Sequence, residues 1–325
     1  MKLGALVVAL ALAVAVSPGA TTAATAGRIP GARAVRACAG AGPYWPTMTL
    51  AVTGSTAWIA CKEQARLIRL ALPGGKRTAS VRLDGPVIAV AAGFGSVWAL
   101  DTGSTLYRLE PRSGRVSKRI RLGAIAAYNV WIGAGAVWVA DDQDARILRV
   151  SRSTNEVVAR IRVGDGPADL AFSGNAAFVL NHRDNTLFRI DLKTNRATLL
   201  ASLADGNAAA ERIALLGGSV WVTGRGVSLL EVDPATGATK RAIDVDGTGI
   251  DIVVARGELW LPVRTAAVDR TGFPTMTAVR RVTTQGIVST IAIARGRVDV
   301  HGLAAGLGSV WLADNTSGLL YRLPA

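Results

Sequence analysis

A motif that ends in an aromatic residue recurs along this chain at intervals close to 40 residues. Its clearest copies, Gly-x-Gly-Ser-Val-Trp, lie at residues 93–98 and 306–311, and looser copies lie between and before them. The aromatic residues of the seven copies are Trp58, Trp98, Trp138, Phe178, Trp221, Trp260 and Trp311. A period of this length is typical of repeat proteins whose units cannot bury their apolar faces alone and must stack on their neighbours.

The copy at residues 168–203 shows how one unit is built. Gly-Asn, Asp-Asn and Thr-Asn turns divide it into four short segments, which we predict as strands at Ala168–Ser173, Ala176–Asn181, Thr186–Leu192 and Arg196–Leu203. Four short antiparallel strands per 40-residue unit are typical of a propeller blade. The sequence therefore predicts an all-β, seven-bladed β-propeller.

The two ends of the repeat array predict how the ring closes. The last copy stops after its third strand, Leu319–Leu323, whereas Arg33–Ala39 precedes the first copy and belongs to no blade. We expect this N-terminal segment to join the last blade as its outer strand, because an open edge would otherwise remain. Cys38 and Cys61 form an even pair, for which a disulfide and two buried free thiols are both open, with the disulfide favoured in an exported protein.

The first 26 residues have the organisation of a secretory signal peptide. Lys2 precedes the apolar run Leu6–Val16, and an Ala-x-Ala site ends at Ala26. We therefore divide the chain into a signal peptide at 1–26 and a single propeller domain at 27–325, and expect a secreted or extracytoplasmic location. No later stretch is long and apolar enough to predict a transmembrane segment.

The chain is strongly basic, with 37 Lys and Arg against 23 Asp and Glu and a net charge of +14. Two interpretations are open: a solvated outer surface, or attraction to an anionic partner such as a cell-wall polymer or lipid headgroups. Nucleic acid is not an expected partner, because the charges are not interleaved with exposed aromatic residues. We expect a monomer.

Two recurring positions have the character of scaffold residues. The repeated aromatic residue falls on the second strand, where a large side chain fills the space between neighbouring blades. An arginine recurs on the third strand, at Arg69, Arg108, Arg149, Arg189 and Arg322. Recurrence in blade after blade favours packing, pairing between blades or outward solvation over a role in a single active site.

Polar residues gather at one face of the predicted disc. At the start of the first strand of successive units, nearest the central channel, lie the candidate ligand-binding residues Asn129, Asp169, Glu211, Arg212 and Asp251. After the second strand lie Asp101, Asp141, Asn181 and Asp314, for which an ordinary role in hairpin turns is the alternative. Groups of this kind around a channel mouth suit a polar ligand or a cation.

The copies at 93–98, 133–141 and 306–314 resemble the blades of YVTN/NHL-like and virginiamycin B lyase-like propellers, over almost all of residues 27–325. The resemblance implies the propeller fold. For the lyase branch it also implies that His301 is the general acid/base beside an ester carbonyl, and that Asp299 and Asp314 help to hold a magnesium ion.

Three functional hypotheses follow. The first is a binding platform on the channel-mouth face for a protein, a wall polymer or a small ligand, with Tyr44, Trp45, Tyr128 and Trp131 as candidate exposed aromatic residues. The second is a metal-assisted lyase or hydrolase centred on His301, with magnesium or calcium as cofactor. The third is a structural role. The insertion Thr265–Thr277 is expected to project from the sixth blade.

Overall fold

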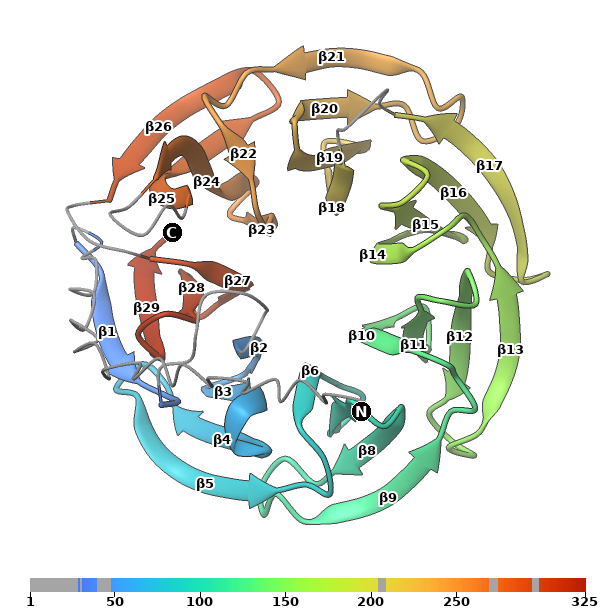
Figure 1. Ribbon diagram of the computed structural model, residues 1–325, viewed down its shortest axis with the longest axis vertical. Helices are drawn as coiled ribbons and strands as arrows, with labels where there is room; N and C mark the ends of the chain where they lie inside the picture. The colour runs from blue at the N-terminus through green and yellow to red at the C-terminus, as the bar shows by residue number, and fades with distance from the viewer. Residues whose placement is uncertain (1–28, 30, 40–47, 204–208, 269–273, 294–297) are drawn as a thin grey trace, which may run out of the picture.

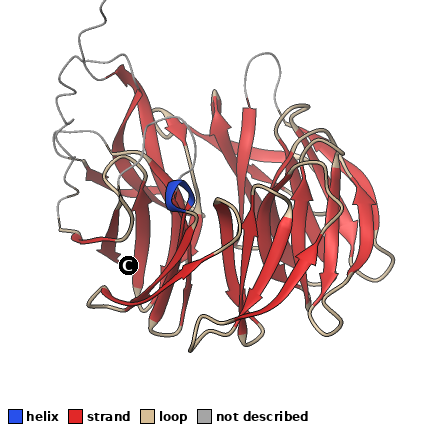
Figure 2. Ribbon diagram, turned by 60° about the horizontal axis from the view of Figure 1, so that its bottom comes forward, coloured by secondary structure: helices blue, strands red, loops and turns tan. Residues whose placement is uncertain are grey.

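Seven antiparallel sheets stand around a central axis in the computed structural model of the chain (Figure 1). The structure describes residues 29, 31–39, 48–203, 209–268, 274–293 and 298–325. Within these ranges Figure 2 shows strands and loops and one short 3₁₀ turn, η1 (Lys62–Gln64). The predicted all-β, seven-bladed propeller is confirmed.

Each blade runs from an inner strand beside the axis to an outer strand on the rim. Blade 1 consists of β2 (Met48–Thr53), β3 (Thr56–Cys61), β4 (Arg66–Ala71) and β5 (Lys76–Arg82). Blade 2 consists of β6 (Val87–Gly93), β7 (Ser96–Asp101), β8 (Thr105–Leu109) and β9 (Val116–Arg121). Blade 3 consists of β10 (Ala127–Gly133), β11 (Ala136–Asp141), β12 (Arg146–Ser151) and β13 (Val157–Arg162). Blade 4 consists of β14 (Pro167–Ser173), β15 (Ala176–Asn181), β16 (Thr186–Asp191) and β17 (Arg196–Ser202). Blade 5 consists of β18 (Ala209–Leu216), β19 (Ser219–Arg225), β20 (Val227–Val232) and β21 (Thr239–Ile243).

Blade 6 departs from the regular pattern. It consists of β22 (Thr248–Gly249), β23 (Val253–Ala255), β24 (Glu258–Val268), β25 (Pro274–Thr283) and β26 (Gly286–Ala292), and β22 and β23 both pair with β24. The inner strand is thus divided in two. The insertion expected at Thr265–Thr277 continues strands β24 and β25 beyond the length of their counterparts, and residues 269–273 lie outside the described ranges.

The last blade confirms the predicted closure. It consists of β27 (Val300–Gly306), β28 (Ser309–Asp314), β29 (Leu319–Pro324) and, as its outer strand, β1 (Arg33–Arg36). β1 pairs antiparallel with β29, with Arg33 opposite Arg322 and Arg36 opposite Leu319. The Cys38–Cys61 disulfide is present and joins the end of this closing strand to blade 1. The predicted signal peptide, Tyr44 and Trp45 lie outside the described residues.

The repeated Gly-x-Gly-Ser-Val-Trp motif is a hairpin whose two glycines have different roles. The second and third residues, such as Ala134 and Gly135, both have positive φ (49° and 73°), as in the tight turns that join twisted strands. At the first glycine, a Cβ on Gly133 would lie 2.3 Å from the ring of Phe172 in the next blade. The first glycine therefore permits close approach of blades, and the second permits the turn.

The repeated aromatic residues form the core between blades. All six tryptophans of the motif are no more than 1% exposed. Trp138 Nε1 donates a hydrogen bond to the carbonyl oxygen of Gly133 at 2.9 Å, so the ring also closes back on its own hairpin. The repeated aromatic residue is buried in every blade, which fits its predicted role in packing between blades.

Third-strand arginines link one blade to the next. The Arg108 guanidinium lies 5.1 Å from the Trp98 ring centroid and donates to the carbonyl oxygen of Arg152 in blade 3 at 2.8 Å. Arg69 reaches the carbonyl oxygen of Arg112 in blade 2, and Arg149 reaches that of Leu192 in blade 4. Pairing between blades, one of the roles considered for these arginines, is thus observed at three positions.

Among the outer strands, the cations are concentrated on one arc of the rim. Strands β1, β5, β9 and β13 contain no Asp or Glu, and their exposed cations are Arg33, Arg36, Lys76, Arg77, Arg82, Lys118, Arg119, Arg121, Arg160 and Arg162. These four strands follow one another around the outside of the ring (Figure 1). An anionic partner for this arc stays a prediction.

Candidate functional site

One residue per blade occupies an equivalent place on the inner strand, two positions before the residue that pairs with the repeated aromatic residue. In five blades a one-residue bulge immediately precedes it. Around the ring these positions hold Thr49, Ala89, Asn129, Asp169, Arg212, Asp251 and Gly302. Blades 3 to 6 thus present an unbroken polar arc, while the other three blades present small residues.

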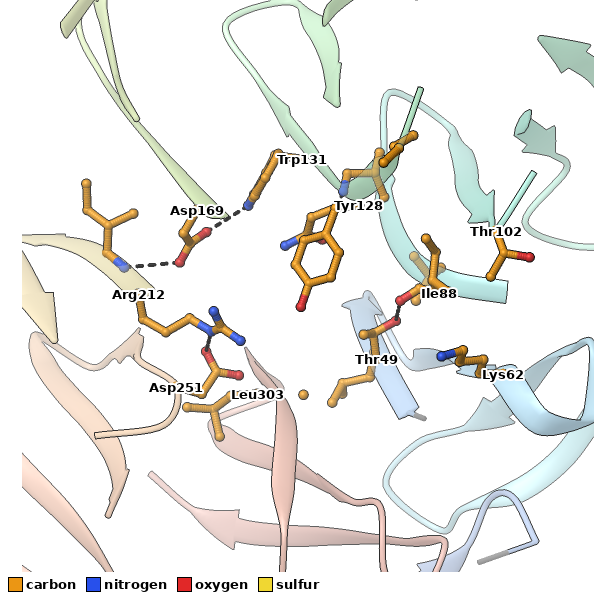
Figure 3. Close-up of a pocket in the computed structure, with 18 of the residues that line it drawn as sticks. Thr49, Lys62, Ile88, Thr102, Tyr128, Trp131, Asp169, Arg212, Asp251 and Leu303 are labelled. Atoms are coloured by element: carbon orange, nitrogen blue, oxygen red, sulfur yellow. Dashed lines mark hydrogen bonds and ion pairs between the residues drawn. The ribbon is translucent and has the colours of Figure 1, made fainter. Parts of the chain in front are cut away.

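Six of these seven positions line a cavity of about 480 Å³ at the mouth of the ring (Figure 3). The polar arc forms one side of the cavity wall. The other side is largely apolar, with Leu50, Ile88, Val90 and Leu303, and it also holds Thr49, Thr102 and Lys62. Ile125, whose side chain is 66% exposed, stands at its edge. This size, and this mixture of hydrocarbon with a few polar groups, are typical of small-molecule sites.

Asp169 is held by three donors from neighbouring blades and its own strand. Its Oδ1 accepts hydrogen bonds from Trp131 Nε1 at 2.9 Å and from the Leu170 N–H at 2.8 Å, and its Oδ2 accepts the Ile213 N–H at 3.0 Å. Burial raises the pKa of this carboxyl to about 6, against the opposing effect of the Arg212 charge. Asp169 therefore titrates near neutral pH.

Arg212 lies between two carboxylates in the same wall. Its side chain is 16% exposed, its Nε lies 3.7 Å from Asp251 Oδ1, and its Nη1 donates to the Glu211 carbonyl oxygen at 2.8 Å. Burial lowers the pKa of Arg212, but the charges of Asp251 and Asp169 outweigh that effect and leave it raised. The guanidinium is therefore a permanent cation in a largely desolvated place.

Two aromatic residues of β10 complete the polar side. Trp131 stands where the inner strands of the other blades have alanine or valine, and its indole N–H is the group that donates to Asp169. Tyr128 points into the middle of the cavity in Figure 3. Burial raises the pKa of its phenol, which stays protonated at neutral pH.

The predicted ligand-binding residues divide into two groups. Asn129, Asp169, Arg212 and Asp251 come from four blades and line the one cavity. Glu211 lies at the bulge beside them, outside the cavity wall, with a carboxylate oxygen 3.9 Å from Arg225. That any of them binds a ligand stays a prediction.

The carboxylates that follow the second strands are buried within turns. Asp101, 4% exposed, accepts the N–H groups of Gly103 and Thr105, both at 2.9 Å, and the Tyr107 hydroxyl at 2.8 Å. Asp141 is fully buried and accepts the N–H groups of Ile125 and Ala126. These contacts match the alternative interpretation of the set as turn residues.

Asp314 and Asp299, predicted as metal ligands, both have protein partners. Asp314 is fully buried, its Oδ1 accepts the Asp299 N–H at 2.9 Å and the Thr316 N–H at 3.0 Å, and burial raises its pKa. The Asp299 side chain forms an ion pair with Arg264. His301 belongs to β27, but its side chain lies outside the described residues. No group of three His, Cys, Asp or Glu residues suited to a metal occurs among those described, and the catalytic and metal roles stay predictions.

The apolar side of the cavity, and Lys62, were not singled out from the sequence. Leu50, Ile88 and Leu303 belong to strands whose alternation indicates burial, and nothing in that alternation distinguishes a core residue from one that lines a channel. Lys62 lies in η1, after a second strand. The bulges that shift residues of five inner strands relative to the regular alternation are visible only in the strand pairing of the structure.

Comparisons with known proteins give the fold class. A scan against family models and a search of curated proteins find no match. Among solved structures, a virginiamycin B lyase from Staphylococcus aureus is 17% identical over 90% of this chain and 99% of its own, with a TM-score of 0.72. A streptogramin B lyase is 15% identical over 90% and 97%, with a TM-score of 0.70. BamB from Moraxella catarrhalis is 16% identical over 86% and 83%, with a TM-score of 0.60.

These likenesses define the class of protein. The chain is a seven-bladed β-propeller whose fold resembles that of the virginiamycin B lyases. At identities below 20% they concern the fold, and one fold of this kind supports many functions. No helix within the described ranges is long and apolar enough to cross a bilayer.

Proposed function

We propose that this protein is an exported propeller that binds a small ligand in the cavity at the mouth of its ring. The observation that carries the proposal is the partly buried row Asp169, Arg212 and Asp251 on one side of a 480 Å³ cavity whose other side is largely apolar. Blades 1, 2 and 7 have Thr, Ala and Gly at the same position, so the fold itself does not require charges there. Buried charges are costly unless they are paired, and their presence favours a function.

Export is supported by the signal-peptide pattern of residues 1–26 and by the Cys38–Cys61 disulfide, since such bonds persist in oxidising compartments. A wall polymer or a protein partner on the same face belongs to the same hypothesis. The cavity favours a small molecule over either.

The test follows the indole N–H of Trp131 by NMR. Its peak is identified by its absence in Trp131→Phe, and the buried Trp58 supplies a reference peak. Octanoate, octylamine, octanol and indole serve as probes of different charge. We expect at least one probe to shift the Trp131 peak and to leave the Trp58 peak in place. If no probe moves the Trp131 peak, ligand binding in this cavity is contradicted.

A lyase reaction is the second candidate function. Two of the similar structures are lyases, and Gly302, the neighbour of His301 in β27, lines the cavity. His301 with Asp299 and Asp314 would then supply the acid/base group and hold magnesium or calcium. The test is whether the same samples consume virginiamycin B. If they do so only with Mg²⁺, and if His301→Ala abolishes the reaction, the lyase function replaces the binding function.

A further inference from the structure

The hydrogen-bond acceptors in the cavity wall are already occupied by the protein. Asp169 receives three donors, Asp251 Oδ1 accepts the Ile252 N–H at 2.8 Å, and Asn129 Oδ1 accepts the Val130 N–H at 2.9 Å. In each case a side-chain oxygen turns back to the N–H of the next residue, and this orients its remaining atoms. Asp169, with three donors, therefore has the least capacity left for a donor on a ligand.

The donors of the same wall are not saturated. Within the described residues, Arg212 Nη2, Asn129 Nδ2 and the Tyr128 hydroxyl have no hydrogen-bond acceptor, and all three residues line the cavity. Figure 3 shows the Arg212 guanidinium and the Tyr128 ring directed towards the same central space. A polar group placed there meets donors from two different blades, 3 and 5.

We propose that the cavity binds a small carboxylate whose oxygens face Arg212 and Tyr128 and whose hydrocarbon body lies against the apolar side. This inference rests on the proposed function and names the ligand class. A guanidinium matches a carboxylate in a bidentate geometry, and a buried cation strengthens such a hydrogen bond. The apolar side, with Leu50, Ile88, Val90 and Leu303, favours a body of methylene groups or a ring.

Proton uptake accompanies this binding. Asp169 faces Arg212 of β18, Asp251 beyond β22, and Tyr128 and Trp131 of β10, and its carboxyl has a pKa of about 6. A bound carboxylate repels the ionised form of Asp169, so binding favours its protonation. The affinity should therefore fall as the pH rises through 6, while an uncharged ligand shows no such dependence.

The experiment measures octanoate, octanamide and octylamine binding by calorimetry to the full mature chain at pH 5.5 and 7.5. We expect octanoate to bind at least tenfold more tightly than the other two, more tightly at the lower pH, and about fourfold more tightly for each methylene added between butanoate and octanoate. Equal affinity for the amide or the amine would overturn the proposal.

Two variants test the assigned donors. Tyr128→Phe removes a hydroxyl that has no acceptor among the described residues, so the fold should be retained while octanoate binding weakens about tenfold. Arg212→Gln should weaken it further and leave octanamide unchanged, and Arg225→Gln, 70% exposed and outside the cavity, is the matched control. Unchanged octanoate affinity in both Tyr128→Phe and Arg212→Gln sinks the carboxylate assignment. If octanol or indole binds and octanoate does not, the ligand class is wrong while the binding function stands.

Discussion

At the scale of single residues, one position on each inner strand has the largest effect on the site. In five blades a bulge accompanies it, and Asp169, Asn129 and Asp251 at this position each accept the N–H of the next residue. A carboxylate or amide at this position therefore satisfies the backbone that the bulge disrupts. The same geometry leaves Arg212 and Tyr128 with donors to spare.

Asp169 gives a prediction for stability as a function of pH. Its pKa in the folded protein, about 6, lies above the value of an unfolded chain, so its contribution is fully present below about pH 4 and is lost as the pH rises through 6. The loss is up to about 3 kcal/mol for two pKa units. The free energy of urea unfolding should therefore fall, relative to Asp169→Asn, between pH 4.5 and pH 7.5.

The comparison with Asp169→Asn is needed because other carboxyls act in the opposite direction. The Thr236 and Ala235 N–H groups lower the pKa of Asp233 to about 2, so that group stabilises the fold as the pH rises. Its contribution is the same in both proteins and cancels in the difference. A difference that does not change with pH would show that Asp169 is not buried as described.

At the scale of secondary-structure elements, third-strand arginines join neighbouring blades. The Arg108 guanidinium packs on the Trp98 ring, and its Nε donates a hydrogen bond to Ser96 Oγ at 2.9 Å. Its Nη1 donates to both the carbonyl oxygen of Arg152 and Asn155 Oδ1 in blade 3. One side chain thus joins the second strand of its own blade to a turn of the next. Its recurrence was visible in the sequence, whereas the partner in the next blade was not, because that partner is mostly backbone.

We expect Arg108→Ala to lower the free energy of unfolding by about 1–3 kcal/mol, since the turn of blade 3 loses a charged donor and Trp98 loses the guanidinium packed on its ring. Arg108→Lys should recover only part of this, because an ammonium cannot reach both acceptors while it covers the ring. The control is Arg115→Ala, whose ion pair with Glu110 is 69% and 44% exposed and should contribute less than about 1 kcal/mol. An equal effect of both alanine variants in chemical denaturation would contradict the role of Arg108 as a link.

At the scale of the whole molecule, the closure of the ring determines how the blades hold together. β1 supplies the outer strand of the last blade, and Cys38 then bonds to Cys61 at the end of β3 in blade 1. The first and last blades are therefore linked by strand pairing and by a covalent bond. Without β1, the outer edge of β29 would have no partner strand, so this pairing also covers the open edge of the last blade.

Loss of the covalent link should be measurable. The Cys38→Ser, Cys61→Ser double variant removes a cross-link between residues 23 apart, which the chain-entropy model values at about 3 kcal/mol. We expect the variant to unfold at a lower guanidinium concentration than the oxidised wild type. The wild type under reducing conditions should have the same midpoint as the variant. If both midpoints match that of the oxidised protein, strand pairing alone closes the ring.

The sequence predicted the architecture far better than the site. Repeat spacing located the strands of blade 4 to within one residue at each end, and the unpaired Arg33–Ala39 segment predicted the closing strand. The cavity was harder to predict, because Leu50, Ile88 and Leu303 have the residue types of ordinary strand positions, and only the structure shows that they line a cavity. The division of the inner strand in blade 6 was missed for the same reason: a change in pairing leaves no mark on residue type.

The seventh blade contains strands from both ends of the described chain, β1 and β27–β29, and so brings these ends together. Ile29 and Ala325 pack in the same cluster, so the two ends of the described propeller meet. A short Gly-Ser linker from residue 325 to residue 29 would leave every strand pair in place, and new termini could open at any exposed hairpin on the rim. Circular permutation of this propeller is therefore compatible with its fold.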